Sequence, residues 1–409
     1  MQIQEQLQIR KEKGYEIAKT KKIVMEGHKW IVPSQNSINK KYEVTLYLNR
    51  QVCTCPDFTG RGLKCKHIFA VQITIEKEID GSGNVSITHT KRITYKQDWP
   101  NYDKAQTQQK ELFMKLLFDL CGTIQEEQQV GRGRPRLAIQ DVLFSSALKV
   151  FTTFSLRRFT TDMKLAGQLG YIKKTPHFSM VSYYMEKAEI TPIIKEMITL
   201  SAMPLKSVET DFAIDSTGFR TTKFNDYCRE KHHIEKQHLW VKTHLCCGVK
   251  TNIVTAVEID SGHDTLQFIP LATKTHDIGF TIKEVSGDKA YNSKANYTAI
   301  AEFGGTAYIP FKSNTSPWGN SSSKGNQAKT WRKMYRFFTY NQDEFLEHYH
   351  KRSNAESTNN MIKSKFTDLV RSKNKTAQIN EVLLKVLCHN ICVLIQEMFE
   401  LGIEPDFVG

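Results

Sequence analysis

Apolar and polar residues alternate in the first part of the chain, which is the pattern of β-strands. Two β-rich runs, HKWIVPS at 28–34 and YEVTLYL at 42–48, flank the polar loop QNSINKK and predict a hairpin. Further along, the stretch QQKELFMKLLFDLCGTI at 108–124 has apolar residues at helical spacing and predicts an amphipathic helix. We therefore expect a small β-rich module near the N-terminus, followed by helices.

The middle of the chain is helical throughout. Helical spacing runs from 138 to 203, with breaks at Gly170 and Pro176. Just before it, GRGRPRL at 131–137 carries three arginines and no acid, so it can lie in a narrow A·T minor groove or serve as an ordinary basic linker. The helices also carry basic residues compatible with a helix-turn-helix, although no recognition helix is defined: Arg157, Arg158, Lys164, Lys173 and Lys174.

Strands and helices are mixed in the second half of the chain. The run VETDFAIDSTGF at 208–219 predicts a short strand that ends at Asp215 and is followed by a turn. After it we expect two antiparallel strands (HLWVKTHLCCGV and NIVTAVEI), a helix (TLQFIPLATKTH), a strand before Asp288, another helix, and the short strand TAYIPF. This β-β-β-α-β-α-β order predicts a mixed α/β layer fold.

One polar helix stands out near the C-terminus, YHKRSNAESTNNMIK at 349–363, which contains no Pro or Gly. Read as one continuous helix, it places Tyr349, Arg352, Glu356 and Lys363 on one narrow face. A carboxylate among cations can meet metal and phosphate. Taken alone, the same face could also be a solvated surface with salt bridges.

The charge of the chain points to a polyanionic partner. Its 409 residues carry a formal net charge of +14 and are 40% hydrophobic, enough for two or three domains with their own cores. No apolar run approaches the ~20 residues of a spanning helix, so we expect nucleic acid and no membrane. The first residues, MQIQEQLQIRKEKG, lack the apolar core of a secretory signal. The nine cysteines form no disulfide pattern, which favours a reducing cytoplasm.

Four potential metal ligands lie close together in the N-terminal part. Within VCTCPDFTGRGLKCKHIFAV, two pairs of soft ligands are separated by nine residues, and they are Cys53, Cys55, Cys65 and His67. Two such pairs can close a tetrahedron around one zinc ion, whereas the alternative is four unrelated residues. Because four protein ligands leave no open position, we expect structural and not catalytic zinc.

Acidic residues at strand ends form the second candidate site. Asp215 and Asp288 each follow a predicted strand and precede loop residues, and Glu356 lies on the polar helix. If the fold brings them together, three carboxylates suit two-metal phosphodiester chemistry, and Mg²⁺ prefers a few carboxylates plus substrate phosphate. The alternative is a scatter of surface acids and caps, with Asp215 capping a turn.

Two motif sets resemble known families. The residues CTCPDF…CKHIFAV, with Trp30 and the strand at 42–48, closely resemble the SWIM-type zinc finger over roughly residues 25–75. That resemblance implies an accessory module that binds DNA or protein. DST at 215, GDKAYNS at 287 and Y-x2-R-x3-E-x6-K at 349 resemble the DDE transposases of bacterial and archaeal insertion sequences, in the branch with the YREK signature.

The transposase resemblance implies a fold and a set of residue roles over about 205–400. It implies an RNase H-like core in which Asp215, Asp288 and Glu356 hold Mg²⁺ or Mn²⁺. Tyr349, Arg352 and Lys363 would contact DNA phosphates and terminal nucleotides. It also implies a homodimer on paired element ends, acting in the cytoplasm at the nucleoid of a prokaryote. His389, in the closing helix, reads as a packing or polar core residue.

The interval between Asp288 and Glu356 is too short for the large β-domain that some relatives insert there. It contains the basic run FKSNTSPWGNSSSKGNQAKTWRKMYR at 311–336, with no acid and with Trp318, Trp331 and Tyr335. Its Ser/Gly/Asn centre predicts a loop. Two interpretations stay open, namely stacking on a distorted DNA end or a plain solvated loop.

The sequence therefore predicts an α/β protein in which a small β-rich zinc module and a helical region precede an RNase H-like mixed sheet flanked by helices. The expected domains are a SWIM module at 1–95, a helical DNA-binding region at 96–204 and a DDE catalytic domain at 205–409. The expected function is metal-dependent cleavage at element ends and strand transfer. The alternatives are a catalytically inactive DNA-binding descendant of a transposase and a Mg²⁺-dependent nuclease without strand transfer.

Overall fold

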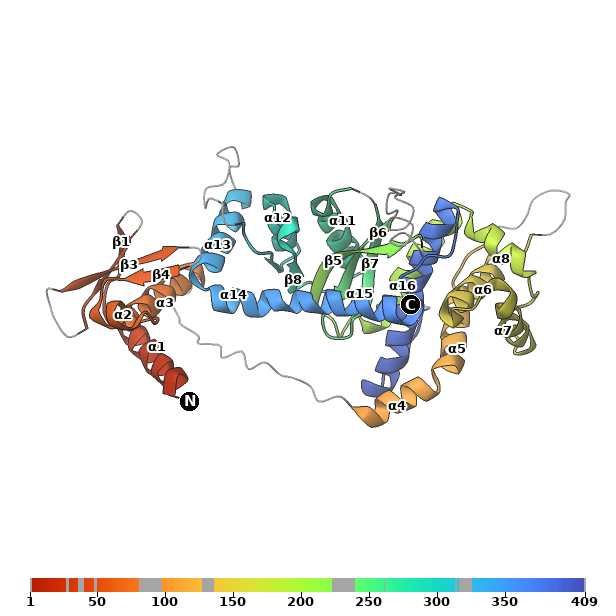
Figure 1. Ribbon diagram of the computed structural model, residues 1–409, viewed down its shortest axis with the longest axis horizontal. Coiled ribbons are helices and arrows are strands. Elements are labelled where there is room, and N and C mark those ends of the chain that lie inside the picture. The colour runs from red at the N-terminus through yellow and green to blue at the C-terminus, as the bar shows by residue number, and fades with distance from the viewer. Residues whose placement is uncertain are drawn as a thin grey trace, which may run out of the picture. The chain divides into compact units, whose positions relative to one another are not determined.

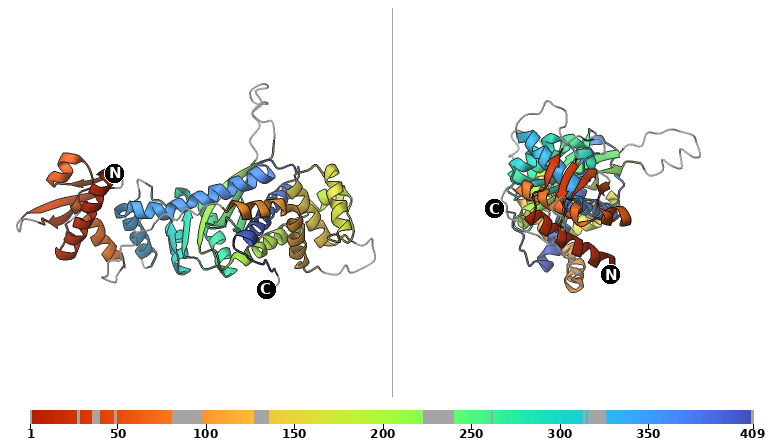
Figure 2. Two further views of the ribbon diagram at one scale, coloured as in Figure 1. Left: turned by 90° about the horizontal axis from the view of Figure 1, so that it is seen from below. Right: turned by 90° about the vertical axis from the view of Figure 1, so that its left-hand side faces the viewer.

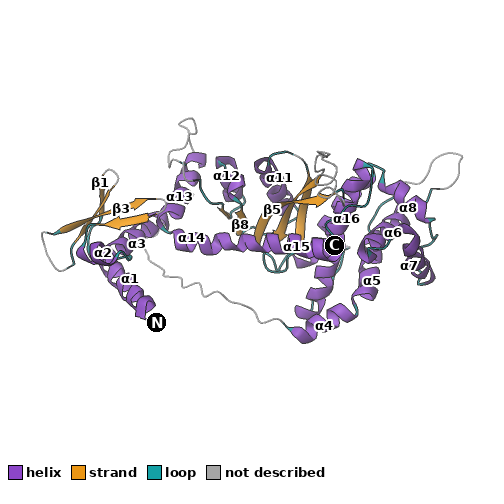
Figure 3. Ribbon diagram, in the orientation of Figure 1, coloured by secondary structure: helices purple, strands orange, loops and turns teal. Residues whose placement is uncertain are grey.

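The computed structural model describes most of the chain and divides it into two compact units. The described residues are 2–26, 29–35, 40–47, 50–80, 98–126, 136–222, 240–260, 262–312, 315 and 326–407. One unit comprises residues 1–94 together with 310–349, and the other comprises 95–309 together with 350–409. Figure 3 shows that the strands are confined to two sheets, one in each unit, and that most other described residues are helical.

The first unit combines a four-stranded antiparallel sheet with helices (Figure 1). Strands β2 and β3 form the hairpin expected from the alternating pattern, with Trp30 opposite Val44. The elements of this unit are α1 (Gln2–Thr20), β1 (Val24–Glu26), β2 (Lys29–Pro33), β3 (Lys41–Tyr47), β4 (Arg50–Cys53), α2 (Pro56–Arg61), α3 (Lys66–Asp80), α13 (Asn326–Tyr340) and α14 (Gln342–Tyr349).

A compact core joins the sheet of this unit to its helices. Val32 and Val44 are fully buried beside Ile68 of α3. Helices α1 and α3 approach closely at Gly14, where an added Cβ would lie 2.6 Å from the Phe69 Cβ. A side chain at position 14 would therefore force the two helices apart.

Residues 310–349 belong to this same unit, because helix α13 and the following turn pack on the zinc-finger region. The Tyr340 ring lies edge-on to Trp30 at 6.4 Å between centroids, and the Gln72 side chain donates a 2.7 Å hydrogen bond to the Tyr340 carbonyl. Lys64 pairs with Asp343 at 2.7 Å. The segment before Glu356 is thus partly a structured extension of the N-terminal module.

Residues 326–336 of the basic run belong to helix α13, so the alternative of a plain solvated loop is wrong for them. Trp331 and Tyr335 are 6% and 9% exposed, and their ring centroids lie 4.9 and 5.3 Å from that of Phe311. Their apolar area stabilises this helix and is not available for stacking on a DNA end. Trp318 and the Ser/Gly/Asn centre lie outside the described residues, as do residues 131–135 of GRGRPRL.

The second unit begins with helices and continues into a five-stranded sheet. The helices at 109–122 and between 139 and 202 confirm the helical pattern and its breaks near Gly170 and Pro176. The elements are α4 (Trp99–Thr107), α5 (Gln109–Gly122), α6 (Ile139–Thr152), α7 (Leu156–Gln168), α8 (Phe178–Met185), α9 (Ile190–Ala202), η1 (Met203–Leu205), β5 (Asp211–Arg220), β6 (Trp240–Gly248), β7 (Val254–Ile259), α11 (Asp264–Asp277), β8 (Glu284–Gly287), η2 (Lys289–Tyr291), α12 (Lys294–Glu302), β9 (Thr306–Tyr308), η3 (His350–Arg352), α15 (Ser353–Phe366) and α16 (Lys375–Glu400).

The sheet of this unit has the strand order β7-β6-β5-β8-β9. Strands β5, β6 and β7 are antiparallel neighbours, whereas β8 and β9 run parallel to β5. Helices α11 and α12 lie along one side of the sheet, and α15 packs on β5 and β6 (Figures 1 and 2). This mixed sheet with flanking helices confirms the predicted RNase H-like α/β fold.

Helix α16 forms the centre of the second unit. By length and composition it could cross a membrane, but 83% of its most apolar window is buried within the fold. It packs against α4, α6 and α9. His389 of this helix is 4% exposed and donates a 2.9 Å hydrogen bond from Nε2 to the Asn252 carbonyl, which confirms its role in the core. We therefore assign α16 to the hydrophobic core.

Candidate functional site

A buried cluster of three cysteines and one histidine lies in the first unit. Cys53 ends β4, Cys55 precedes α2 as its N-cap, and Cys65 and His67 lie at the start of α3. One ligand atom from each of these residues lies within 4.8 Å of the others. The structure thus brings together all four residues that the sequence predicted as zinc ligands. Within the described ranges, it is the one group of three or more His, Cys, Asp or Glu this close.

The protonation of this cluster suits a metal site. The His67 Nδ1 atom lies 3.9 Å from the Sγ atoms of both Cys53 and Cys65. A hydrogen bond from the Cys53 thiol lowers the pKa of Cys65, whereas that same bond and burial raise the pKa of Cys53. The lowered pKa favours the thiolate form of Cys65, which is the form that binds zinc. Four protein ligands fit a closed structural site.

Asp215 lies in the middle of β5, so the expectation that the strand ends there is wrong. The strand continues to Arg220, because residues 216–220 pair with 240–244 of β6. Pairing with Lys242 holds Gly218 in the strand, although glycine is depleted in strands. On its other side, β5 pairs with β8 only as far as Ile214, which lies opposite Gly287. Asp215 is therefore the first residue of β5 that no longer pairs with β8.

Asp288 is the residue immediately after β8, and parallel pairing places it beside Asp215. Its carboxylate accepts a 2.6 Å hydrogen bond from the Lys289 N–H and caps the short helix η2. The capping role that we considered for Asp215 thus belongs to Asp288. Because β5 and β8 are parallel neighbours, both carboxylates lie at the same end of the sheet.

Glu356 reaches this region from helix α15, and Arg352 connects it to the sheet. The Arg352 guanidinium lies 3.6 Å from Asp215 Oδ1 and donates a hydrogen bond to Glu356 Oε1. The side chains of Arg352 and Asp215 are 20% and 18% exposed, and that of Glu356 is 55% exposed. A cation thus lies between two of the predicted metal ligands.

The electrostatics of Asp215 connect all three acids. Burial raises the pKa of its carboxyl group, the Arg352 charge lowers it, and Glu356 and Asp288 raise it. Glu356 and Asp288 are therefore close enough for their negative charges to act on the Asp215 carboxyl group. Three mutually repelling carboxylates with hard oxygen atoms match the ligands that divalent cations such as Mg²⁺ prefer.

Asn359 is a member of this cluster that the sequence did not reveal. Its amide donates a 3.4 Å hydrogen bond to Asp215 Oδ2, while its own Oδ1 is buried without a partner in the described part of the chain. The available signal was its position three residues after Glu356, on the same helix face. Asn359 fixes the orientation of the Asp215 carboxylate.

Lys351 was also missed, and it fastens the residues before α15 to the sheet. Its Nζ atom lies 2.6 Å from Asp211 of β5 and 2.7 Å from Glu284 of β8. These partners are 140 and 67 residues away in sequence, so no local pattern could reveal them. The two ion pairs hold the start of α15, and with it Glu356, at the sheet.

Two family models match the chain at these two sites. Residues 206–391 match the transposase DDE domain, and residues 42–75 match the SWIM zinc finger. The chain carries a transposase DDE domain and a SWIM zinc finger. An uncharacterized protein of Aquifex aeolicus (strain VF5) is 27% identical in an alignment 186 residues long, which covers 43% of this chain and 56% of that relative. No solved structure matches the chain.

The DDE domain contains the three acids, Arg352 and Lys363. It indicates a transposase or nuclease type of enzyme that uses a divalent metal and has DNA as its partner. The SWIM zinc finger contains all four clustered ligands and indicates zinc binding in the first unit. The specific reaction and the role of each acid remain predictions.

Two of the residues predicted to contact DNA, Tyr349 and Lys363, belong to different units. Lys363 lies 5.6 Å from the centroid of the Phe219 ring; burial lowers the pKa of its amine, and the nearby Asp368 and Asp215 raise it. Tyr349 is the last residue of α14 and belongs to the first unit. The single continuous helix predicted over 349–363 is wrong, because the 3₁₀ turn η3 separates α14 from α15. The role of Tyr349 stays a prediction.

Proposed function

We propose that the protein is a DNA transposase that cuts at the ends of an insertion sequence and joins the freed 3′ hydroxyl to target DNA. The observation that supports this most directly is that, within a transposase DDE domain, Arg352 contacts both Asp215 and Glu356, and the charge of Asp288 also acts on Asp215. The net charge of +14 favours a polyanionic substrate.

The acids would bind cations and position the scissile phosphate. Arg352 and Asn359 orient Asp215, the Lys289 N–H orients Asp288, and Lys351 anchors the start of the helix that carries Glu356. Groups held in this way lose little entropy at the moment of reaction. When bound, a pair of Mg²⁺ or Mn²⁺ ions would stabilise the attacking and the leaving oxygen atoms.

The reaction would consist of two in-line displacements at phosphorus. In the first, a water oxygen forms a bond to phosphorus and the bond to the 3′ oxygen breaks, which frees a 3′ hydroxyl. In the second, that hydroxyl attacks a target phosphodiester and a target 3′ oxygen leaves. Neither step needs a covalent bond to the protein, so we assign Tyr349, Arg352 and Lys363 to positioning of DNA.

The proposal also covers the oligomeric state, the roles of the domains and the cellular location. Because two element ends must be joined to one target, we propose a homodimer with one DDE domain for each end. Residues 1–95, 96–204 and 205–409 would be the zinc module, a DNA-binding helical region and the catalytic domain. We place the protein in the prokaryotic cytoplasm at the nucleoid, where its buried free cysteines would stay reduced.

A strand-joining assay tests this function. A labelled oligonucleotide with a 3′ hydroxyl and a candidate element end would be incubated with supercoiled plasmid, zinc-loaded protein and Mg²⁺ or Mn²⁺. We expect metal-dependent joining by the wild-type chain and none by Asp288→Asn. The control variant is Asp277→Asn, since the Asp277 side chain is 67% exposed at the end of α11.

The other outcomes separate the alternatives. Nicking without joining, at several ends and with both metals, would identify a nuclease without strand transfer. DNA binding with neither reaction would identify a catalytically inactive descendant. Joining that Asp288→Asn retains would contradict the assignment of the acids.

A further inference from the structure

A pocket of about 260 Å³ lies in the second unit, among the helical region and the loop that follows α15. Ser146 and Lys149 of α6, the start of α7 and Arg371 line it. An apolar wall, which includes Phe154, completes it, and Phe154 is 46% exposed, so the pocket reaches the surface. The pocket is smaller than the ~300–1,000 Å³ of typical drug-sized ligand sites, which favours a small group.

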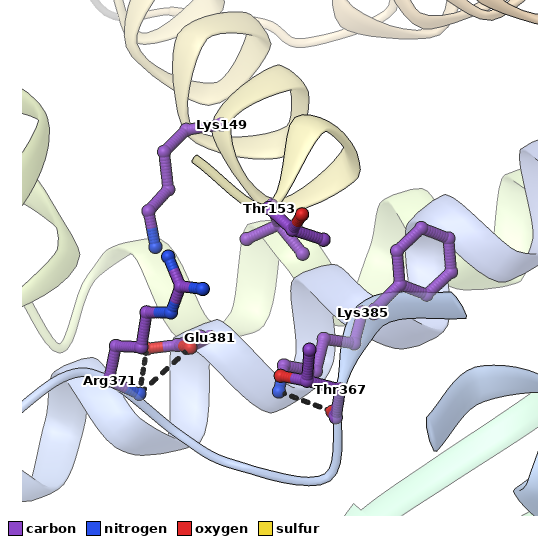
Figure 4. A pocket seen from close by; sticks show the side chains of 8 residues that line it. Lys149, Thr153, Thr367, Arg371, Glu381 and Lys385 are labelled. Carbon is purple, nitrogen blue, oxygen red and sulfur yellow. Dashed lines mark hydrogen bonds between the residues drawn. The ribbon is translucent and has the colours of Figure 1, made fainter. Parts of the chain in front are cut away.

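The surroundings of this pocket hold more positive than negative charge. Figure 4 shows the Lys149 amine and the Arg371 guanidinium pointing toward each other above Glu381 in the adjoining cavity. Glu381 is 3% exposed and accepts hydrogen bonds from the Arg371 N–H, the Ser372 N–H and the Ser372 hydroxyl. Lys385 donates hydrogen bonds to the Thr367 and Leu369 carbonyls, and burial lowers its pKa to about 8. Three basic residues and one carboxylate therefore line this adjoining cavity.

Two polar features of the pocket lack partners of their own. The Ser146 hydroxyl is buried, with the residue 1% exposed, and forms no hydrogen bond within the described part of the chain. Ser155 is the N-cap of the 13-residue helix α7, yet no described side chain caps this helix. The first N–H groups of α7 are therefore available, and its first turn carries Arg157 and Arg158 and no acid. Helix N-termini with free N–H groups bind phosphate.

We propose that this pocket binds a phosphate group of a DNA strand, with Lys149 and Arg371 as the charged partners. The Ser146 hydroxyl and the first N–H groups of α7 would donate hydrogen bonds to the phosphate oxygens. Arg can meet phosphate with two parallel hydrogen bonds, and Lys supplies a point charge. The ligand neutralises the excess positive charge and satisfies the unpaired hydroxyl.

The position of the pocket in the chain favours DNA as the source of the phosphate. Helix α15 carries Glu356 and Lys363 and runs directly into residues 367–372, which supply Arg371. A strand held at the acids would thus meet a second fixed point beside α6 and α7. The assignment to DNA rests on the proposed function, whereas the phosphate site itself does not.

The first arm of the test uses inorganic phosphate and no DNA. The melting temperature of the zinc-loaded full chain, without divalent metal at the acids, would be measured in phosphate and in chloride at equal ionic strength. A ligand that binds the folded state raises the melting temperature. We expect a phosphate-specific increase in the wild-type chain that Lys149→Gln, Arg371→Gln and Ser146→Ala each lose. Lys115→Gln and Lys373→Gln, which remove exposed charges, should keep it.

Ser146→Ala distinguishes binding from folding. Removing a buried hydroxyl that has no partner should leave the melting temperature in chloride unchanged or raise it. Loss of the phosphate response in this variant would therefore reflect the pocket and not a damaged fold. A wild-type chain with no phosphate-specific increase would overturn the site.

The second arm measures DNA affinity against salt concentration. Each neutralised phosphate contributes about 0.9 to the slope of log affinity against log salt, so Lys149→Gln should lower that slope by about one and the controls should not. If the variants lose the phosphate response but keep the slope, the pocket serves a free phosphate and the DNA assignment fails. Absence of strand joining in the wild-type chain would count against the proposed function alone.

Discussion

At the scale of single residues, Arg352 organises the acidic cluster. It contacts Asp215 and Glu356, which would otherwise repel each other. The sequence marked Arg352 as a DNA contact because the YREK spacing carries that implication. It could not show the contact with Asp215, since residues 215 and 352 are 137 positions apart in the chain. The motifs suggest the three acids as metal ligands, which stays a prediction, whereas no local pattern pointed to the contacts of Asn359 and Lys351.

Asn359 gives a test of this orientation. Asn359→Ala removes the hydrogen bond to the Asp215 carboxylate, and bonds to charged groups are worth ~1.5–3 kcal/mol. We expect the strand-joining rate to fall by about tenfold to a hundredfold while the melting temperature changes little. The matched control is Asn360→Ala, the neighbouring exposed asparagine, which should retain the wild-type rate. Equal rates in both variants would contradict the role of Asn359.

His389 predicts how stability depends on pH. Burial lowers the pKa of its imidazole from 6.5 to about 4. The unfolded state therefore binds a proton at His389 more readily than the folded state does. The contribution of His389 to the free energy of unfolding is complete above pH 6.5 and is lost as the pH falls toward 4. The loss amounts to at most about 3 kcal/mol. Denaturant unfolding at a series of pH values would measure it.

Two histidine variants provide the comparison. His389→Gln keeps a donor for the Asn252 carbonyl and should flatten the fall in unfolding free energy between pH 6.5 and 4. His276→Gln changes a side chain that is 44% exposed and should leave the fall unchanged. The same pH dependence in both variants would show that other groups cause it.

At the scale of elements, periodicity predicted the identity of most helices and strands but not where they end. Strand β5 runs five residues beyond Asp215 because β6 pairs with it, which the residues STG do not reveal. Helix α13 forms where a solvated loop was one alternative, because its aromatic residues have an apolar partner in Phe311. In both cases, contacts distant in sequence overrode the local signal.

The packing of α13 and α14 within the first unit predicts an effect of zinc removal. A structural zinc supplies folding free energy directly, and Tyr340 and Asp343 contact the zinc-finger residues Trp30 and Lys64. A chelator should therefore abolish hydrogen-exchange protection in α3 and also in α13. Amides of β5 and α16, in the other unit, should stay protected. Protection of α13 that survives chelation would show that it folds without the module.

At the scale of the whole molecule, each compact unit is built from two segments that are not contiguous in the sequence. The segment 310–349 belongs with the N-terminal module, although in sequence it lies between Asp288 and Glu356 within the DDE domain. Sequence motifs identified both families, because the spacing of the zinc ligands and the short motif around each acid are local patterns. The division into three domains at 95 and 204 stays a proposal.

The central claim is that Asp215, Asp288 and Glu356 together hold a divalent cation. Titration of Mn²⁺ into the zinc-loaded chain bound to a DNA end tests it without requiring turnover. We expect Asp215→Asn, Asp288→Asn and Glu356→Gln each to weaken Mn²⁺ binding by at least about tenfold, since even outer-shell partners are worth that much. Asp277→Asn should bind as the wild-type chain does. Wild-type affinity in all three acid variants, or no binding by the wild-type chain, would contradict the claim.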